Sequence, residues 1–328
     1  MREWVMPLVA GILSFCLLAP WGGAFVKALL DRGIGKQIRY DGPQSHQAKS
    51  GTATMGGIYF LIGISLCALV LLIGWREPAV LAVWLAMILQ AAVGAFDDLQ
   101  GLKDSSGYGW LAGGKFLVQW GVAALIALAI YLLVPGLVCR WPDERISALG
   151  LWALPLSMLL LVGTSNAVNL SDGLDGLAAG LCAIAYGCFG LLCLMSGQVV
   201  LASLCFGMVG SLLAFLWFNV HPARMFMGDV GSQALGAGLA AVAILSGYWW
   251  LLPLVGLVFL AVTVSVMLQV SWFKYTRRRY GEGRRLLRMA PLHHHFEMLG
   301  WSEVQVTLRF WIAGAISALL ALLVVALW

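Results

Sequence analysis

Long runs of apolar residues follow one another along almost the whole chain, and short polar segments separate them. An α-helix needs roughly 20 apolar residues to cross the hydrocarbon core of a bilayer, and most of the runs approach that length. The pattern predicts an all-α integral membrane protein with about ten transmembrane helices, in which residues 1–328 form a single polytopic membrane domain. The predicted spans lie near residues 4–26, 54–74, 79–96, 115–135, 150–168, 176–196, 199–219, 232–247, 249–273 and 307–328.

The composition supports a membrane protein. Apolar residues make up 61% of the chain and charged residues only 11%, whereas a soluble domain carries about 45–50% and about 25%. The seven cysteines are scattered singly, and none forms a C-x-x-C pair. We therefore expect neither a disulfide framework nor a cysteine zinc site.

Positive charge is divided unequally between the two sets of loops that alternate along the spans. One set, residues 27–53, 97–115, 169–175, 220–231 and 274–306, contains 15 Lys and Arg residues, and the other contains four. The positive-inside rule places the richer set in the cytoplasm, so we expect both termini to be periplasmic and the active site to lie at the cytoplasmic face. The net charge of +5 is then a topology signal, and without a basic face interleaved with aromatic residues no nucleic-acid partner is expected.

The segment 166–176 places Asn166, Asn169, Asp172 and Asp175 at a strict three-residue spacing between two apolar runs. Polar side chains at the edge of a hydrocarbon segment are costly and usually mark a site. On a continuous helix the four would fan over roughly 180°, and two glycines within the segment favour an opening of the helix that turns them toward a ligand. The alternative is a polar loop with a helix cap, for which Ser171 and Asp172 are suitable residue types.

Three further acids belong to the same set of loops. Asp97 and Asp98 end the third span, and Asp229 precedes the eighth between glycines. Adjacent helical residues point about 100° apart, so we expect the two neighbouring aspartates to have different roles. With Asp172 and Asp175 they make five acids, which repel one another unless a cation or protons intervene. Mg²⁺ prefers such hard oxygen ligands, and a proton-coupled transporter is the competing explanation for acids in a membrane.

Two other loops suit phosphate binding. The segment 49–57 combines Lys49 with hydroxyl groups and glycines, although glycines at the start of a membrane helix often serve only packing. The segment 291–297 contains three consecutive histidines. They cannot all face one metal from a regular helix, and no cysteine partner supports a Zn²⁺ site, so hydrogen bonds from the imidazoles to a diphosphate fit better. The arginines that precede them, between 284 and 288, serve either as ligands or as a positive-inside anchor.

These motifs give the chain a close resemblance to the bacterial phospho-N-acetylmuramoyl-pentapeptide transferases, within the superfamily of polyprenyl-phosphate N-acetylhexosamine-1-phosphate transferases. The triple-histidine loop is the most specific motif, because it separates this family from relatives that transfer N-acetylhexosamine phosphates to the same lipid. The resemblance runs nearly from end to end and includes Asp41-Gly42-Pro43 with His46, Lys49 to Gly57, Asp97-Asp98, Asn166 to Ala178, Phe226 to Ser232, and Ala290 to Glu297 followed by Gly300-Trp301.

The resemblance implies a reaction and a location. Undecaprenyl phosphate would attack the β-phosphorus of UDP-N-acetylmuramoyl-pentapeptide, with release of UMP and formation of lipid I for peptidoglycan synthesis. The enzyme is expected to be a Mg²⁺-dependent phosphoglycosyl transferase in the bacterial inner (cytoplasmic) membrane, surrounded by membrane lipid. A homodimer is compatible with the apolar outer faces of the spans, but a monomer would have such faces as well.

The resemblance also assigns roles to site residues. Asp229 is expected to bind Mg²⁺, and one of the catalytic pair Asp97 and Asp98 to orient or deprotonate the lipid phosphate. The need for a base is modest, because a phosphate monoester with a second pKa of about 6 is mostly dianionic at pH 7; in a two-step route one aspartate would instead be the nucleophile. The substrate-binding residues are expected to be Lys49, Leu174, Asp175 and Phe226 around the uridine, Asn169 and Asp172 beside the ribose and diphosphate, and Lys115, His293 and His294 on the diphosphate oxygens.

Several positions depart from the family pattern, including Gln100, Gly101 and Leu102, where relatives are often basic. Ala53 stands where a proline is usual, Val230 replaces a threonine after the metal-binding aspartate, and Ser171 replaces a threonine. Loss of the proline relaxes the backbone, and loss of the hydroxyl beside Asp229 changes a contact behind the metal ligand. We expect these changes to affect the rate more than the class of reaction.

Two alternatives to this function remain. The first is a relative that uses a UDP-N-acetylhexosamine, against which the triple-histidine loop argues. The second is a transporter or lipid flippase that uses the acids as a proton relay. Transporters often contain paired broken helices in related halves, whereas this chain has no repeat and gathers its polar residues at one face.

Overall fold

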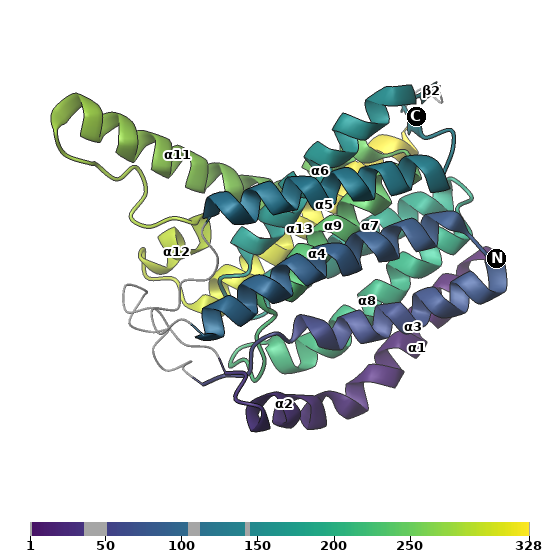
Figure 1. The fold of residues 1–328 in the computed structure, drawn as a ribbon, viewed down its shortest axis with the longest axis horizontal. Helices are drawn as coiled ribbons and strands as arrows, with labels where there is room; N and C mark the ends of the chain where they lie inside the picture. Colours follow the sequence, from purple (N-terminus) through teal and green to yellow (C-terminus); the bar gives the residue numbers. More distant parts are fainter. Residues whose placement is uncertain (1, 36–50, 104–111, 142–144, 328) are drawn as a thin grey trace.

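The computed structural model describes residues 2–35, 51–103, 112–141 and 145–327. Ten helical segments in this part of the chain are long and apolar enough to cross a membrane, by length and composition (Figure 1), which confirms the predicted number of spans. They are α1 (Val5–Leu18) continued by η2 (Ala19–Trp21) and α2 (Gly22–Asp31), α3 (Gly57–Trp75), α4 (Pro78–Lys103), α5 (Ala112–Leu133), α6 (Ala153–Ser171), α7 (Leu177–Met195), α8 (Val199–Asn219), α9 (Gly228–Ser246), α11 (Leu257–Tyr280) and α13 (Glu303–Ala326).

Helix α9 lies at the centre of the bundle, where it packs against α4, α6 and α7. Almost all of its residues are buried, and many are glycine, alanine or serine. Small residues let helix backbones approach closely inside a membrane, where lipid tails are as apolar as the side chains and burial alone drives little association. At Gly236 an added Cβ atom would lie 2.5 Å from the Cα atom of Ser165 on α6, so the close contact of these two helices requires glycine.

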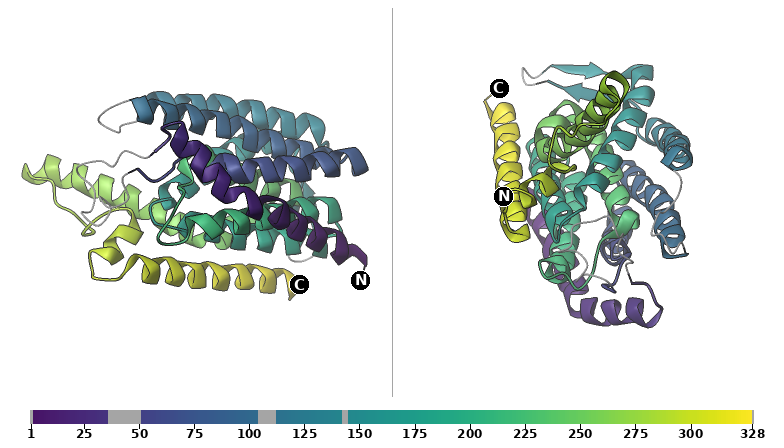
Figure 2. Two further views of the ribbon diagram at one scale, coloured as in Figure 1. Left: turned by 90° about the horizontal axis from the view of Figure 1, so that it is seen from below. Right: turned by 90° about the vertical axis from the view of Figure 1, so that its left-hand side faces the viewer.

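The outer helices expose apolar side chains, as helices that face lipid do. Helices α1, α5, α11 and α13 carry many exposed leucine, isoleucine and valine residues. Figures 1 and 2 show α11 projecting beyond the rest of the bundle. The N-terminus and C-terminus lie at the same end of the bundle, opposite the short helix α12 (Leu292–Glu297), as an even number of crossings requires.

A short two-stranded sheet differs from the all-α expectation. Strands β1 (Val138–Arg140) and β2 (Ile146–Ala148) are antiparallel, with Cys139 opposite Ser147. Arg140 Nε donates to the main-chain carbonyl of Ser246 (3.2 Å), and Trp250 Nε1 donates to that of Arg140 (2.7 Å), so the hairpin is fixed to the end of α9. The remaining short helices are η1 (Arg2–Trp4), η4 (Gly150–Trp152), η5 (Trp249–Leu251) and α10 (Leu252–Val255).

Several helices extend beyond the ends that the apolar pattern indicates, among them α11, which continues to Tyr280, and α13, which begins at Glu303. Helix α4 continues to Lys103 instead of ending near residue 96, and α9 begins at Gly228 instead of near residue 232. Hydropathy locates only the part of a helix that lies in hydrocarbon, whereas the backbone hydrogen bonds let the helix continue through polar residues. As a consequence, Asp97, Asp98 and Asp229 stand on helices, which fix the directions of their side chains.

Candidate active site

Four helices bring three of the five predicted acids together with a lysine and an asparagine. Asp97 and Asp98 belong to α4, Lys115 to the first turn of α5, Asn169 to the last turn of α6 and Asp229 to the first turn of α9. Hydrogen bonds and ion pairs link these residues directly. We call the five residues the acidic cluster.

Lys115 bridges two carboxylates of the acidic cluster. Its Nζ atom lies 2.9 Å from Asp97 Oδ2 and also contacts Asp229 Oδ2. The three side chains are largely buried, so water screens their charges only weakly. One ammonium group therefore offsets the repulsion that the sequence predicts for neighbouring acids.

Asp98 holds the N-terminus of α9. Its Oδ1 atom accepts a hydrogen bond from the main-chain N–H of Asp229 (3.0 Å), and its Oδ2 atom accepts one from Val230 N–H (2.9 Å). The residue that precedes α9, Met227, provides no side-chain cap, so Asp98 supplies the cap from another helix. A carboxylate at this end of a helix is also stabilised by the helix dipole. The neighbouring aspartates thus point to different partners, as the helical geometry predicts.

The carboxylate of Asp229 is oriented from several sides. Its Oδ1 atom accepts a hydrogen bond from Asn169 Nδ2 (2.9 Å), and its Oδ2 atom accepts one from Gln233 Nε2 (3.3 Å) in addition to the Lys115 contact. The preceding residue, Gly228, has a φ of +74°, and a Cβ atom there would lie 2.6 Å from Asp98 Oδ2. Glycine at 228 therefore allows α4 and the start of α9 to meet.

The donor set of the acidic cluster fits Mg²⁺. Asp97 and Asp229 present carboxylate oxygens toward a common position, and the Lys115 ammonium already places a positive charge between them. Hard oxygen ligands of this kind are those that Mg²⁺ prefers, and Mg²⁺ usually takes only one or two protein carboxylates together with phosphate oxygens and water.

The helix opens where the sequence predicts. Helix α6 ends at Ser171 and α7 begins at Leu177, and the turn between them includes Gly176 with a φ of +75°. Within this turn Asp172 is half-buried and Leu174 is buried. The segment 172–176 is therefore a turn and not a helix, and it follows Asn169 of the acidic cluster directly along the chain.

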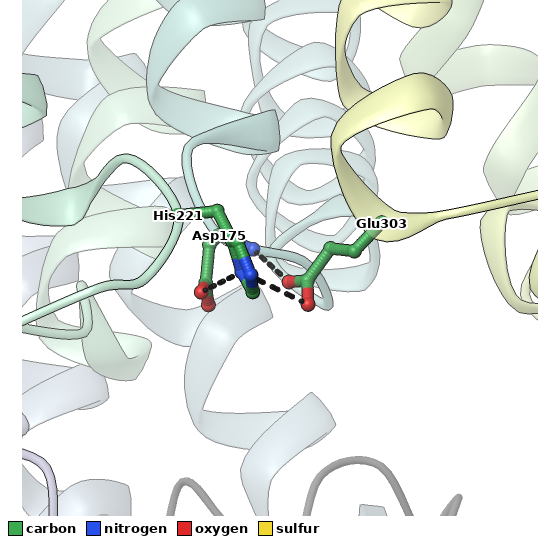
Figure 3. A group of neighbouring side chains, drawn as sticks. All are labelled: Asp175, His221 and Glu303. Atoms are coloured by element: carbon green, nitrogen blue, oxygen red, sulfur yellow. Dashed lines mark hydrogen bonds and ion pairs between the residues drawn. The ribbon is translucent and has the colours of Figure 1, made fainter.

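Two side chains from other elements, His221 and Glu303, clasp Asp175 in this turn (Figure 3). Asp175 Oδ2 lies 3.0 Å from His221 Nδ1 and accepts a hydrogen bond from Ala223 N–H (3.1 Å). Glu303 Oε1 accepts a hydrogen bond from Asp175 N–H (2.7 Å), and its Oε2 atom lies 3.4 Å from His221 Nδ1. The ligand atoms of Asp175, His221 and Glu303 all lie within 4.8 Å of one another, so this clasp joins the turn to the loop after α8 and to the start of α13.

The three consecutive histidines have three different partners. His293 is buried and lies against Gly173, where an added Cβ atom would be 2.2 Å from His293 Nε2. His294 Nδ1 lies 2.6 Å from Glu297 Oε2, and His295 Nδ1 accepts a hydrogen bond from Arg288 N–H (3.1 Å). The rings of His293 and His294 also lie against each other, with centroids 4.3 Å apart.

The glycine-rich loop pairs with the segment that carries Phe226. Phe226 N–H donates to the main-chain carbonyl of Ala53 (2.8 Å), and Gly56 N–H donates to that of Phe226 (2.8 Å). The pairing uses the carbonyl of Ala53, which a proline would also provide. Likewise Val230 binds Asp98 through its main-chain N–H. These two contacts therefore persist despite the departures from the family pattern.

A cavity of about 620 Å³ lies beside the clasp. Its walls come from the glycine-rich loop, the turn, the loop after α8 and the start of α13: Thr52, Asp175, His221, Pro222, Ala223, Glu297, Gly300, Trp301, Ser302 and Glu303. Lys49, predicted to bind the nucleotide, and the predicted motif of Asp41 to His46 lie outside the residues that the structure describes.

Four residues near the site were not singled out from the sequence. Gln119 and Gln233 are carboxamides within apolar spans, the same signal that identified Asn166. His221 and Glu303 stand beside spans as isolated polar residues, and no local spacing relates them to Asp175. Their partnership becomes visible only in the fold.

Comparisons with known proteins identify the family of the chain. Residues 80–247, which carry the whole acidic cluster, match the model of the family described as glycosyl transferase family 4. A phospho-N-acetylmuramoyl-pentapeptide-transferase of Chloroflexus aurantiacus is 40% identical over 331 aligned residues, covering 98% of this chain and 90% of the relative. The protein of that name from Rubrobacter xylanophilus is 40% identical over 322 residues, covering 95% of each chain. The chain therefore belongs to glycosyl transferase family 4 and, within it, to the phospho-N-acetylmuramoyl-pentapeptide-transferase family.

Proposed function

We propose that this protein transfers phospho-N-acetylmuramoyl-pentapeptide from UDP-N-acetylmuramoyl-pentapeptide to undecaprenyl phosphate, which forms lipid I and releases UMP. The observation that carries the proposal is the acidic cluster, in which one cation and three carboxylates from three helices meet. Phosphoryl transfer asks a protein mainly for positioning and charge neutralisation. The name shared by relatives that are 40% identical over 98% of the chain supports the choice of substrates.

The reaction exchanges one bond at phosphorus for another. An oxygen of the lipid phosphate forms a bond to the β-phosphorus, while the bond from that phosphorus to the oxygen shared with the α-phosphorus breaks. UMP leaves with that oxygen and its negative charge. Lys115 is the proposed cation for the diphosphate oxygens, because its ammonium group reaches the centre of the acidic cluster.

Asp97 is the better candidate of the catalytic pair for direct contact with the lipid phosphate. Both oxygens of Asp98 accept main-chain hydrogen bonds from α9, which suits a positioning role. Asp97 faces Lys115 on the neighbouring helix. Asp97 would orient the lipid phosphate or accept its remaining proton, and the same position would serve a nucleophile in the two-step route.

Mg²⁺ is the proposed cofactor, and Asp229 is its proposed ligand. When bound, the ion supplies charge neutralisation to the phosphate oxygens and to the leaving UMP. Asn169 and Gln233 donate to the two oxygens of Asp229 and hold its carboxylate in a fixed orientation. A carboxylate must be deprotonated to bind a metal ion, and these neutral donors would stabilise the charge of Asp229 without cancelling it.

The nucleotide is proposed to bind beside the turn at 172–176. Leu174, Asp175 and Phe226 would surround the uridine together with Lys49, and Asn169 and Asp172 would lie next to the ribose and diphosphate. The cavity lined by Asp175 and Thr52 supports this location. His294 is a proposed diphosphate contact. His293 packs against Gly173, which favours a role in holding the turn in place.

We further propose that the chain is a single domain in the bacterial inner membrane, with the acidic cluster at the cytoplasmic face and both termini periplasmic. The excess of Lys and Arg in one set of loops supports this orientation. The common location of the two termini agrees with it. A homodimer stays a prediction from the family resemblance.

The test measures UMP release by the purified protein in detergent with undecaprenyl phosphate and Mg²⁺. UDP-N-acetylmuramoyl-pentapeptide and UDP-N-acetylglucosamine are supplied in parallel reactions. We expect UMP from the muramoyl donor alone and no UMP after addition of EDTA. UMP from the glucosamine donor would assign the protein to the N-acetylhexosamine transferases, and no UMP from either donor, with the fold intact, would favour the transporter.

A further inference from the structure

A chain of carboxamide side chains runs from the acidic cluster into the interior of the bundle. Asn166 Nδ2 on α6 donates to Gln119 Oε1 on α5 (3.0 Å), and Gln119 Nε2 donates to Gln233 Oε1 on α9 (3.2 Å). Gln233 Nε2 in turn donates to Asp229 Oδ2 (3.3 Å). Gln119 is 1% exposed and Gln233 is fully buried, so each amide depends on its neighbour for hydrogen bonds. We call Asn166, Gln119 and Gln233 the carboxamide chain.

The two ends of the carboxamide chain determine which way every amide points. At the inner end, Asn166 Nδ2 also donates to the main-chain carbonyl of Val162 (2.8 Å), and a carbonyl can only accept. At the outer end, an ionised Asp229 can likewise only accept. One orientation satisfies both ends, and in it the NH₂ group of every amide points toward Asp229. Hydrogen bonds aligned in this way polarise and strengthen one another in surroundings of low dielectric.

The main chain beneath the carboxamide chain is also fixed. Ser165 Oγ on α6 donates to the main-chain carbonyl of Gln233 (3.1 Å), and Gly236 brings the backbones of α6 and α9 together one turn further along. Helix α9 therefore cannot slide along α6 at Gln233 without breaking this buried hydrogen bond. The position from which it donates to Asp229 is set by two helices.

Gln90 on α4 shows that a buried glutamine in this bundle need not join such a chain. It is fully buried and lies between Met87 and Gly94, whose neighbours on α9 are Gly238 and Asp229. Within the residues that the structure describes, neither its Nε2 atom nor its Oε1 atom has a hydrogen-bond partner. Gln90 thus shares the depth and chemistry of Gln119 and Gln233, but no hydrogen bond among the described residues links its side chain to the acidic cluster.

We propose that the carboxamide chain is a positioning device for Asp229, which sets the direction of its carboxylate for Mg²⁺; this inference rests on the function proposed above. Neutral amides stabilise the carboxylate through directed donors without cancelling its charge, whereas a further cation would compete with Mg²⁺. Loss of a residue that supports a metal ligand through hydrogen bonds typically lowers metal affinity or activity by about 10- to 100-fold.

The test compares Gln119→Leu with Gln90→Leu, the same substitution at two buried glutamines. Mg²⁺ binding to the purified full-length protein is measured by isothermal titration calorimetry without substrate, and the Mg²⁺ dependence of UMP release and the thermal midpoint are measured in parallel. Gln119→Leu is expected to weaken Mg²⁺ binding by about tenfold, because Gln233 loses its own support. Gln90→Leu is expected to bind Mg²⁺ as the wild type does.

Wild-type Mg²⁺ affinity in Gln119→Leu would overturn the proposal, and so would an equal loss in Gln90→Leu. If Gln119→Leu fails to fold, Gln119→Met takes its place, because its unbranched chain keeps the length and adapts to the site. Failure of both variants to fold, with Gln90→Leu folded, would show that the carboxamide chain serves stability and would also overturn the proposal. The wild-type sample separates these outcomes from failure of the proposed function, since folded wild-type protein that releases no UMP contradicts the function itself.

Discussion

At the scale of single residues, two adjacent aspartates contact different partners because a helix turns by about 100° per residue. Asp97 pairs with Lys115, whereas Asp98 caps α9 through two main-chain hydrogen bonds. The chemical type of these residues and their divergence could be predicted from the sequence. Which of the two would cap a helix could not be predicted, because the main-chain N–H of Asp229 that Asp98 binds lies 131 positions further along the chain.

We expect Asp98→Asn to lower the thermal stability of the protein more than Asp97→Asn does. The asparagine can keep one of the two bonds, but its NH₂ group would face the second main-chain N–H. Loss of a cap typically costs about 1 kcal/mol. Thermal midpoints of the purified variants in detergent check this, and equal midpoints for the two variants would contradict the capping role of Asp98.

Gly228→Ala is expected to reduce both stability and activity. An alanine would be strained at a φ of +74°, and its Cβ atom would lie 2.6 Å from Asp98 Oδ2. The strain of the left-handed conformation alone costs roughly 1–2 kcal/mol. Gly23→Ala on α2 is the control, because nothing lies within 4 Å of its added Cβ atom. Thermal midpoints and UMP release are measured for both variants. A Gly228→Ala protein that matches Gly23→Ala in both quantities would show that α4 and α9 do not require glycine at 228.

At the scale of elements, the turn at 172–176 depends on partners that lie far from it in the sequence. The strict spacing of polar residues and the two glycines could predict that the helix opens there. The clasp of His221 and Glu303 on Asp175 could not be predicted, because no periodicity connects the ends of α8 and α13 to this segment. The early start of α9 was missed for a similar reason, since its cap comes from α4.

Glu303→Ala is expected to raise the KM for the UDP donor several-fold while kcat changes less. The substitution removes the acceptor for Asp175 N–H (2.7 Å), which loosens the turn proposed to hold the nucleotide but leaves the acidic cluster intact. Glu303→Gln keeps an acceptor oxygen and should restore a KM near that of the wild type. Steady-state kinetics with varied donor check this, and an unchanged KM in Glu303→Ala would show that the clasp does not shape the nucleotide site.

At the scale of the whole molecule, apolar length alone predicted the number of helices that are long and apolar enough to cross a membrane, but not all of their ends. The arrangement of those spans was not predictable, because membrane helices are apolar on every side and the pattern does not mark their partners. The central place of α9 follows instead from its small residues, which become informative only when the neighbouring backbones are known.

We expect reporter fusions to place both termini and the acidic cluster on opposite sides of the membrane. Alkaline phosphatase, which folds only in the periplasm, should be active when fused to the C-terminus and inactive when inserted after Glu282. Green fluorescent protein, which fluoresces in the cytoplasm, should show the reverse. The positive-inside distribution of Lys and Arg is the physical reason. Phosphatase activity at Glu282 would invert the proposed topology.

The acidic cluster is the proposed active site. The most direct test of this assignment is UMP release from UDP-N-acetylmuramoyl-pentapeptide by three variants. Asp97→Asn and Asp229→Asn should each lose on the order of 100-fold or more of the wild-type rate, because each removes a charge at the reacting phosphates. Asp31→Asn, at the exposed end of α2, is the matched control and should retain the wild-type rate. Normal turnover by either cluster variant, with its fold intact, would contradict the assignment of the active site.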